Sequence, residues 1–159
     1  MITRQHDPHP ERKPYPIVRP RVGNPIRFTC LTRKEFGLDT HYGCNGTFAC
    51  TCDDSCVACR GGNPARYQGY VIGKGSESGV IAVIHLTSNA TAQMVSRRRE
   101  NLGLLGMKVC LSRKGPNENG EVEACVYGFD DGDFEIQDRN LVEIIHAIYR
   151  QKLNLGNLD

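Results

Sequence analysis

Residues 41–59 read HYGCNGTFACTCDDSCVAC and hold six side chains that bind soft metals. The pair Cys56 and Cys59 places two thiolates on one tight turn, where both can reach a tetrahedral zinc ion at about 2.3 Å. Two further ligands must come from upstream. We favour His41 and Cys52, a spacing of H-x10-C-x3-C-x2-C, because one imidazole keeps the site less anionic than four thiolates. The alternative ligands are Cys44 and Cys50.

The eight cysteines of the chain would also suit the disulfide framework of an exported protein, and unligated thiols are a third alternative. Residues 1–20 contain no apolar stretch of the kind that forms a signal peptide. No segment approaches the roughly 18 apolar residues of a membrane span. We therefore expect a reducing, cytoplasmic setting with no membrane contact, and a structural Zn²⁺ ion in preference to disulfides.

Charge is distributed unevenly along this chain of 159 residues. Residues 1–34 carry eight basic and two acidic side chains, whereas residues 128–159 carry seven acidic and three basic ones. A basic first half indicates a polyanionic partner. The first 25 residues also hold six of the eight prolines, so we expect residues 1–24 to form an extended basic arm.

The remainder has the residue patterns of a small, mainly β domain. Five segments have the alternation and composition of strands: 26–33, 66–74, 80–86, 106–113 and 121–127. A helix is expected at 90–102 and a second from 138 to 152. We place the domain at 25–128, with a zinc-binding insertion at 41–62 and an acidic linker and helix at 129–159. The apolar stripe of the last helix comprises Leu141, Ile144, Ile145 and Ile148.

The alternation of side chains predicts which faces of the strands are buried. The run at 80–86 is almost continuously apolar and should be buried on both sides. In the segment 66–74, Tyr70 shares a face with Arg66 and is expected in an open groove, whereas Tyr67 is expected in the core. His85, alone in its apolar strand, is interpreted as a core residue.

This order of elements is strand, insertion, strand, strand, helix, strand, strand, and it resembles the OB-fold over residues 25–128. One histidine followed by three cysteines in the first insertion, here His41, Cys52, Cys56 and Cys59, resembles the zinc-bearing single-stranded-DNA-binding proteins of tailed phages. The resemblance implies a five-stranded barrel whose second and third strands bind single-stranded DNA without sequence specificity, in DNA replication or recombination. RNA is the alternative ligand.

Such a groove binds by stacking bases on aromatic rings, for about 1 to 3 kcal/mol per base, and by neutralising phosphates with Lys and Arg. The residues expected to do so are Arg27, Arg33, Arg66, Tyr70, Lys74, Arg113 and Lys114.

Two other functions fit the sequence. A zinc-knuckle adaptor would bind a protein partner through the stripe of the C-terminal helix. A redox enzyme would use the spare thiols Cys44 and Cys50. We expect no enzyme, because His-Glu-x-x-His spacing is absent from the sequence and a zinc ion with four protein ligands has no open position for a substrate.

Overall fold

The computed structural model describes residues 15–43, 46–51, 54–117, 119–132 and 135–156. In chain order its elements are β1 (Ile17–Val18), β2 (Ile26–Cys30), β3 (Phe36–Gly43), β4 (Gly46–Ala49), α1 (Val57–Arg60), β5 (Arg66–Gly75), β6 (Ile81–Leu86), α2 (Ser88–Val95), β7 (Met107–Arg113), β8 (Val122–Phe129) and α3 (Asp138–Gly156). The fold is mainly β, as predicted. Within these described segments, every helix is too short or too polar to cross a membrane.

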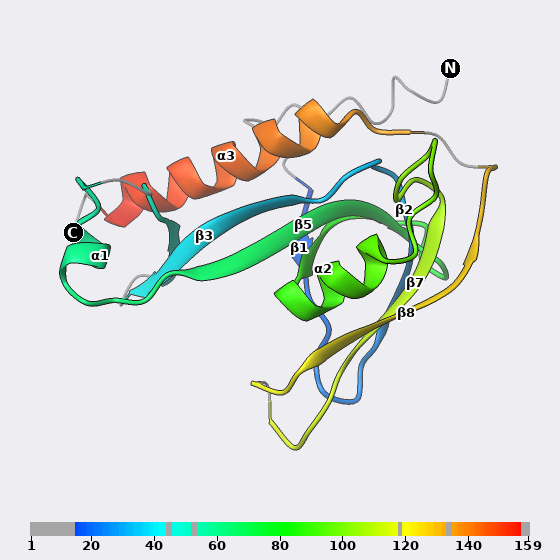
Figure 1. The fold of residues 1–159 in the computed structure, drawn as a ribbon, viewed down its shortest axis with the longest axis horizontal. Helices are drawn as coiled ribbons and strands as arrows, with labels where there is room; N and C mark the ends of the chain where they lie inside the picture. Colours follow the sequence, from blue (N-terminus) through cyan, green and yellow to red (C-terminus); the bar gives the residue numbers. More distant parts are fainter. Residues whose placement is uncertain (1–14, 44–45, 52–53, 118, 133–134, 157–159) are drawn as a thin grey trace.

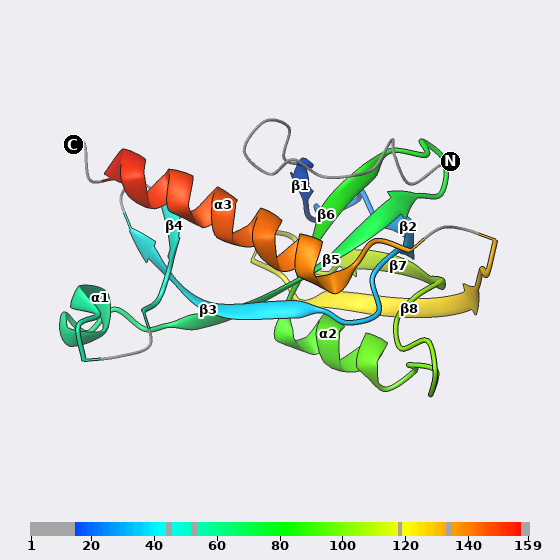
Figure 2. The ribbon, with the colours of Figure 1, turned by 90° about the horizontal axis from the view of Figure 1, so that it is seen from above.

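The five predicted strands pair in the order β6-β5-β2-β7-β8. β2, β5 and β6 are antiparallel neighbours, and β7 returns after α2 to pair with β2. This arrangement, in which the fourth strand lies beside the first, is a Greek key. Figure 2 shows α3 and α2 on opposite sides of the long strands β3 and β5.

The sheet is open, so the prediction of a closed barrel is wrong. Among the described residues β8 pairs only with β7, and the outer edge of β6 pairs in parallel with β1 through Ile17–Val83 and Val18–Ile84. Because β1 occupies that edge, β6 has no free edge to offer β8. β1 belongs to the segment expected to be an extended arm, and Figure 1 shows it beside the sheet.

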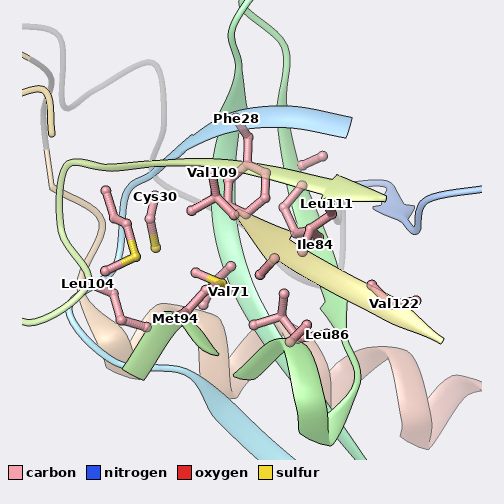
Figure 3. Close-up of a cluster of buried hydrophobic side chains, with 14 residues drawn as sticks. Phe28, Cys30, Val71, Ile84, Leu86, Met94, Leu104, Val109, Leu111 and Val122 are labelled. Atoms are coloured by element: carbon pink, nitrogen blue, oxygen red, sulfur yellow. The ribbon is translucent and has the colours of Figure 1, made fainter. Parts of the chain in front are cut away.

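One hydrophobic core lies between the sheet and α2 (Figure 3). Phe28 of β2, Val71 of β5 and Met94 of α2 are fully buried there. In the last hairpin the buried side chains of Val109 and Leu111 alternate along β7 and lie opposite Val126 and Ala124 of β8. The backbone of β5 comes very close to this core, because a Cβ atom added at Gly73 would lie 2.5 Å from the ring of Phe28.

A second core lies on the other face of the sheet, which we call the outer face. There Ile72 of β5 and Val83 of β6 pack with Leu141, Ile144 and Ile145 of α3. Strand β6 is therefore buried on both faces, as predicted. The apolar stripe of the last helix packs on the protein itself, and the side chain of Ile148 lies outside the described residues.

Helix α2 is shorter than the predicted helix at 90–102. It begins at Ser88, two residues earlier than predicted, and the Thr87 hydroxyl caps it by accepting a hydrogen bond from the Ala90 backbone N–H at 3.2 Å. It ends at Val95, and the chain then turns, with the Arg99 N–H and Gly103 carbonyl 3.0 Å apart. The Arg99 guanidinium lies 4.4 Å from the Phe129 ring centroid and 2.8 Å from an Asp131 carboxylate oxygen, so this arginine is held against the end of β8 and the residues after it.

Candidate metal centre and nucleic-acid interface

The β3–β4 hairpin carries the first metal-binding side chain. His41 on β3 pairs with Phe48 on β4, and their ring centroids are 5.6 Å apart. This hairpin was not predicted, because its segment was interpreted only as a zinc-binding insertion. The dipeptide Asn45-Gly46 could have revealed it, since Asn-Gly between alternating segments is the strongest short-range signal of a hairpin. Gly46 has φ +105°, a backbone conformation that favours glycine.

Four side chains converge beside this hairpin. His41 Nε2 lies 3.5 Å from Cys56 Sγ and 3.4 Å from Cys59 Sγ. Cys50 Sγ lies 3.6 Å from Cys56 Sγ and 3.5 Å from Cys59 Sγ. All four ligand atoms lie within 4.8 Å of one another. His41 and three cysteines are therefore close enough to hold a metal ion.

The distances suit a tetrahedral zinc ion. With Zn–S bonds of about 2.3 Å and Zn–N bonds of about 2.0 Å, the edges of the tetrahedron are about 3.8 Å between sulfurs and about 3.5 Å between sulfur and nitrogen. The four separations given above, 3.4 to 3.6 Å, fall close to these edges. One imidazole with three thiolates is also a donor set that zinc prefers.

Three of the four favoured ligands, His41, Cys56 and Cys59, are members of this cluster. The third sulfur comes from Cys50, which the sequence offered as an alternative. Cys52, the fourth favoured ligand, and Cys44, the other alternative, lie outside the described residues.

Backbone hydrogen bonds fix the loop that carries the cysteines. The Cys50 N–H donates to the Asp39 carbonyl at 2.8 Å, which holds the end of β4 against β3. Cys56 directly precedes the short helix α1, where its carbonyl accepts from the Arg60 N–H at 3.1 Å. The Asn63 side-chain amide then donates to the Tyr42 carbonyl at 3.1 Å and so ties the end of the loop back to β3.

The electrostatics of the cluster favour a cation. Hydrogen bonds from the backbone N–H groups of Cys59 and Thr51 lower the pKa of Cys56 to about 5. Hydrogen bonds with the sulfurs of Cys50 and Cys56 raise the pKa of Cys59 to about 12, and a hydrogen bond with Cys50 raises the pKa of His41. Three sulfurs in mutual contact cannot all ionise unless a positive charge lies between them, and a zinc ion would supply it.

A second feature lies on the outer face of β5 and β6, a hollow of about 780 Å³ that we call the arginine hollow. Its floor comes from β5 and β6, and its walls come from β1 and the residues after it, the β3–β4 hairpin, α3 and the β7–β8 loop. The charged, aromatic and amide side chains that line it are Arg19, Arg21, Tyr42, Arg66, Gln68, Tyr70, His85, Asn119 and Tyr149.

The arginine hollow is strongly basic. Arg19, Arg21 and Arg66 are all exposed at it, and its described lining contains no carboxylate. Tyr42 stands at the same hollow with 77% of its surface exposed, which makes it the most exposed large apolar side chain of the described residues. A basic concavity with an open aromatic ring is suited to a polyanion that carries flat bases.

The floor of the hollow is a polar network. The Gln68 side-chain oxygen lies 2.8 Å from the Tyr70 hydroxyl and 3.2 Å from the Tyr149 hydroxyl, and the two hydroxyls also contact each other. Because each hydroxyl carries one proton, two of these three contacts are hydrogen bonds at any one time. Beside them, both ring nitrogens of His85 are buried and have no hydrogen-bond partner among the described residues. His85 is therefore not the satisfied core residue that we expected. Burial, followed by the charges of Arg19 and Arg113, lowers the pKa of His85 to about 4.

Two predicted residues lie together in the arginine hollow, Arg66 and Tyr70. The expectation that Tyr70 is an open ring is wrong: it is 2% exposed, because α3 covers this face and Tyr149 packs against it. Tyr67 is 38% exposed and so does not lie in the core as expected. Its part of β5 extends past the core to pair with β3.

The other predicted contact residues lie elsewhere. Arg33 forms a bidentate ion pair with Glu135, in which Nε and Nη2 lie 2.7 and 3.0 Å from the two carboxylate oxygens. Arg113 donates to the carbonyls of Pro20 and Gly120, and Lys114 lies 3.3 Å from a Glu123 carboxylate oxygen. Arg27 lines a separate apolar hollow of about 360 Å³, and Lys74 lies on β5 between β2 and β6. The structure thus gathers Arg66 with Arg19, Arg21 and Tyr42, three residues that the sequence did not single out.

Comparison of the chain with models of protein families finds no match, and neither a curated protein nor a solved structure is similar to it. The function of the metal centre and of the arginine hollow has therefore to be inferred from their chemistry.

Proposed function

We propose that this protein binds single-stranded nucleic acid, with DNA as the ligand, in the arginine hollow. The observation that supports this most directly is the gathering of Arg19, Arg21 and Arg66 in one concavity whose described lining contains no carboxylate. Such an array can neutralise phosphate groups, and phosphates repeat along a nucleic-acid strand.

The position of the hollow also supports an OB-fold relationship. OB-folds are partly open Greek-key barrels that bind oligonucleotides on their second and third strands and at the loops after strands one and four. Counted among the five Greek-key strands, β5 and β6 are the second and third, and they form the floor of the hollow. The β3–β4 hairpin lies in the first of those loops and Asn119 in the second.

Binding would combine two interactions. The arginines neutralise phosphates, and the exposed ring of Tyr42 offers a surface on which a base of any identity can stack. This assigns to Tyr42 the stacking role that the sequence assigned to Tyr70.

Zinc would act as a structural ion, because four protein ligands leave it no open position. Alternation along β3 places His41 toward the metal centre and its neighbours Thr40 and Tyr42 at the hollow. A metal ion that fixes His41 therefore fixes one wall of the hollow. Loss of zinc should weaken nucleic-acid binding even though no ligand contacts the nucleic acid.

The adaptor function is less well supported, because the side chains Leu141, Ile144 and Ile145 that would bind a partner are buried on the sheet. The redox function is also less well supported, because Cys50, one of the two thiols that it requires, belongs to the metal cluster.

Fluorescence anisotropy of a labelled oligo-dT, with duplex and RNA competitors, tests the proposal. Affinity should fall steeply between two salt concentrations, by a log–log slope of about 0.7 for each phosphate contacted. Arg66→Gln should weaken binding and lower that slope by roughly one contact, whereas Arg97→Gln, an exposed arginine that lines a separate pocket beside α2, should change neither. Binding that does not depend on salt, or an equal loss in both variants, would contradict the proposal.

A further inference from the structure

His85 is the polar group in the arginine hollow that the proposed function leaves unexplained. Both of its ring nitrogens, Nδ1 and Nε2, are shielded from water and have no hydrogen-bond partner among the described residues. The great majority of buried polar groups in folded proteins are paired. The low pKa of this imidazole keeps it neutral at pH 7, so that one ring nitrogen donates and the other accepts. That pair of groups matches the edge of a nucleobase, which also carries donors and acceptors side by side.

Gln68 extends this polar surface. Its side-chain oxygen faces the hydroxyls of Tyr70 and Tyr149, so its amide nitrogen is the part that can donate to a ligand. Tyr70 lies directly opposite His85 in the β5–β6 pairing, with ring centroids 5.5 Å apart. The tyrosine network thereby holds both Gln68 and His85 in place at the floor.

The charge above this floor also suits the end of a strand. Each internal phosphodiester carries a single negative charge, whereas a terminal phosphomonoester carries nearly two at neutral pH. Three arginines, Arg19, Arg21 and Arg66, surround one hollow. Residues of β1, the β3–β4 hairpin, the β7–β8 loop and α3 also line the hollow, so it is enclosed on several sides. A strand end fits such a site better than a continuous strand.

We propose that the arginine hollow binds the terminal nucleotide of a strand, with its phosphomonoester held by Arg19, Arg21 and Arg66 and its base at His85 and Gln68. This inference rests on the proposed function and narrows its ligand to a phosphorylated end. The protein would then recognise where a strand begins or stops as well as bind along it.

The first test compares three oligo-dT strands of equal length that carry a 5′-phosphate, a 3′-phosphate or hydroxyls at both ends. One phosphorylated strand should bind about tenfold more tightly than the hydroxyl strand, since added charge-assisted hydrogen bonds are worth that much. Which of the two binds more tightly identifies the polarity of the bound end. Equal affinity for all three strands would overturn the inference.

The second test measures thymidine 5′-monophosphate, thymidine and inorganic phosphate by calorimetry on the full chain. The monophosphate should bind most tightly, and thymidine least. His85→Phe keeps an aromatic ring but removes both nitrogens, so it should reduce binding of the monophosphate to the level of inorganic phosphate. His85→Asn, which restores a donor and an acceptor, should recover part of the loss.

His146→Phe is the matched control, because His146 is exposed on α3 and outside the lining of the hollow. Circular dichroism and zinc content establish that each variant is folded. The inference is wrong if His85→Phe and His146→Phe bind the monophosphate equally well, or if no variant or wild-type protein binds it.

The two proposals fail in different ways. Oligonucleotide binding that is indifferent to end phosphates, with no binding of the monophosphate, would remove the inference and leave the proposed function standing. Binding of the monophosphate without binding of any oligonucleotide would remove the proposed function and support a nucleotide site in the hollow.

Discussion

The hydroxyls of Tyr70 and Tyr149 form a hydrogen bond across a separation of 79 residues, and this bond joins α3 to the outer face of the sheet. Both hydroxyls also lie within hydrogen-bond distance of the Gln68 side-chain oxygen, and burial raises the pKa of both tyrosines. The helix thus closes one side of the arginine hollow through a bond that also organises its floor.

Tyr149→Phe should lower the free energy of unfolding by about 1 kcal/mol, because it removes one buried hydroxyl from this network. Urea denaturation followed by circular dichroism measures the change. Tyr127→Phe is the control, since Tyr127 is 46% exposed and its hydroxyl has only a long contact of 3.4 Å with Ser76. An equal effect of the two substitutions would show that the Tyr70–Tyr149 pair does not stabilise the fold.

Cys50→Ser should release zinc and lower the free energy of unfolding by on the order of 4 kcal/mol, because binding of a structural metal contributes directly to folding. Cys52→Ser should keep both the metal and the stability, since His41, Cys50, Cys56 and Cys59 already provide four ligands. Zinc content and urea denaturation of the two variants measure this. The reverse result would replace Cys50 by Cys52 in the ligand set.

Tyr42→Ala should weaken binding of oligo-dT by about 1 to 3 kcal/mol, the contribution of one stacked base, and leave the free energy of unfolding almost unchanged. Anisotropy titration measures the affinity. Tyr127→Ala serves as the control because Tyr127 is an exposed ring on β8, outside the lining of the arginine hollow. If both variants bind as tightly as the wild type, Tyr42 is not a stacking surface.

Stability should depend on pH through His85, which is packed against Tyr70 and lies near the charges of Arg19 and Arg113. Its pKa is lowered from 6.5 to about 4 in the folded protein, so the unfolded chain binds a proton more readily. The unfolding free energy therefore falls as the pH drops from 6.5 toward 4.

His85→Phe should lose this part of the pH dependence and keep the part that is due to carboxylates. Urea denaturation at several pH values in this range gives the comparison. Parallel curves for the variant and the wild type would show that His85 does not titrate as a buried imidazole.

Gly73→Ala should destabilise the protein by about 1 to 3 kcal/mol, the usual cost of overpacking a core. Its new methyl group would lie 2.5 Å from the Phe28 ring and 3.0 Å from Ile84. Gly128→Ala is the control, because the nearest atom to a methyl group there is a Lys108 side-chain carbon at 3.8 Å. Thermal unfolding of the two variants shows whether β5 approaches the core as closely as the structure has it.

The sequence predicted those parts of the fold that local patterns determine. Alternation of apolar residues found β2, β5, β6, β7 and β8 to within a few residues, and the run at 80–86 was correctly interpreted as buried on both faces. The apolar stripe on the last helix was also found, and three of its residues pack on the sheet. Each of these depends on side chains that are close together in the chain.

What the sequence missed depends on long-range contacts. β1 has only two residues and forms a strand because it pairs with the edge of β6. No local pattern in the sequence predicts that pairing. Tyr70 was placed on the correct face, but its burial depends on α3, which begins 68 residues later. The candidate sites show the same division between local and long-range information. Three ligands followed from spacing, whereas the arginine hollow brings together Arg19, Tyr42 and Arg66 from segments with no shared motif.

The pairing of β1 with β6 also protects the sheet from other chains. An unpaired strand edge offers a row of free backbone N–H and C=O groups, and a second molecule can add its own strand there and begin aggregation. In this protein the outer edge of β6, its most apolar strand, is covered by Ile17 and Val18 of the same chain. The β1 segment therefore shields this edge from other chains as well as lining the hollow, and a version shortened to the Greek-key strands would leave the edge open to pairing with a second molecule.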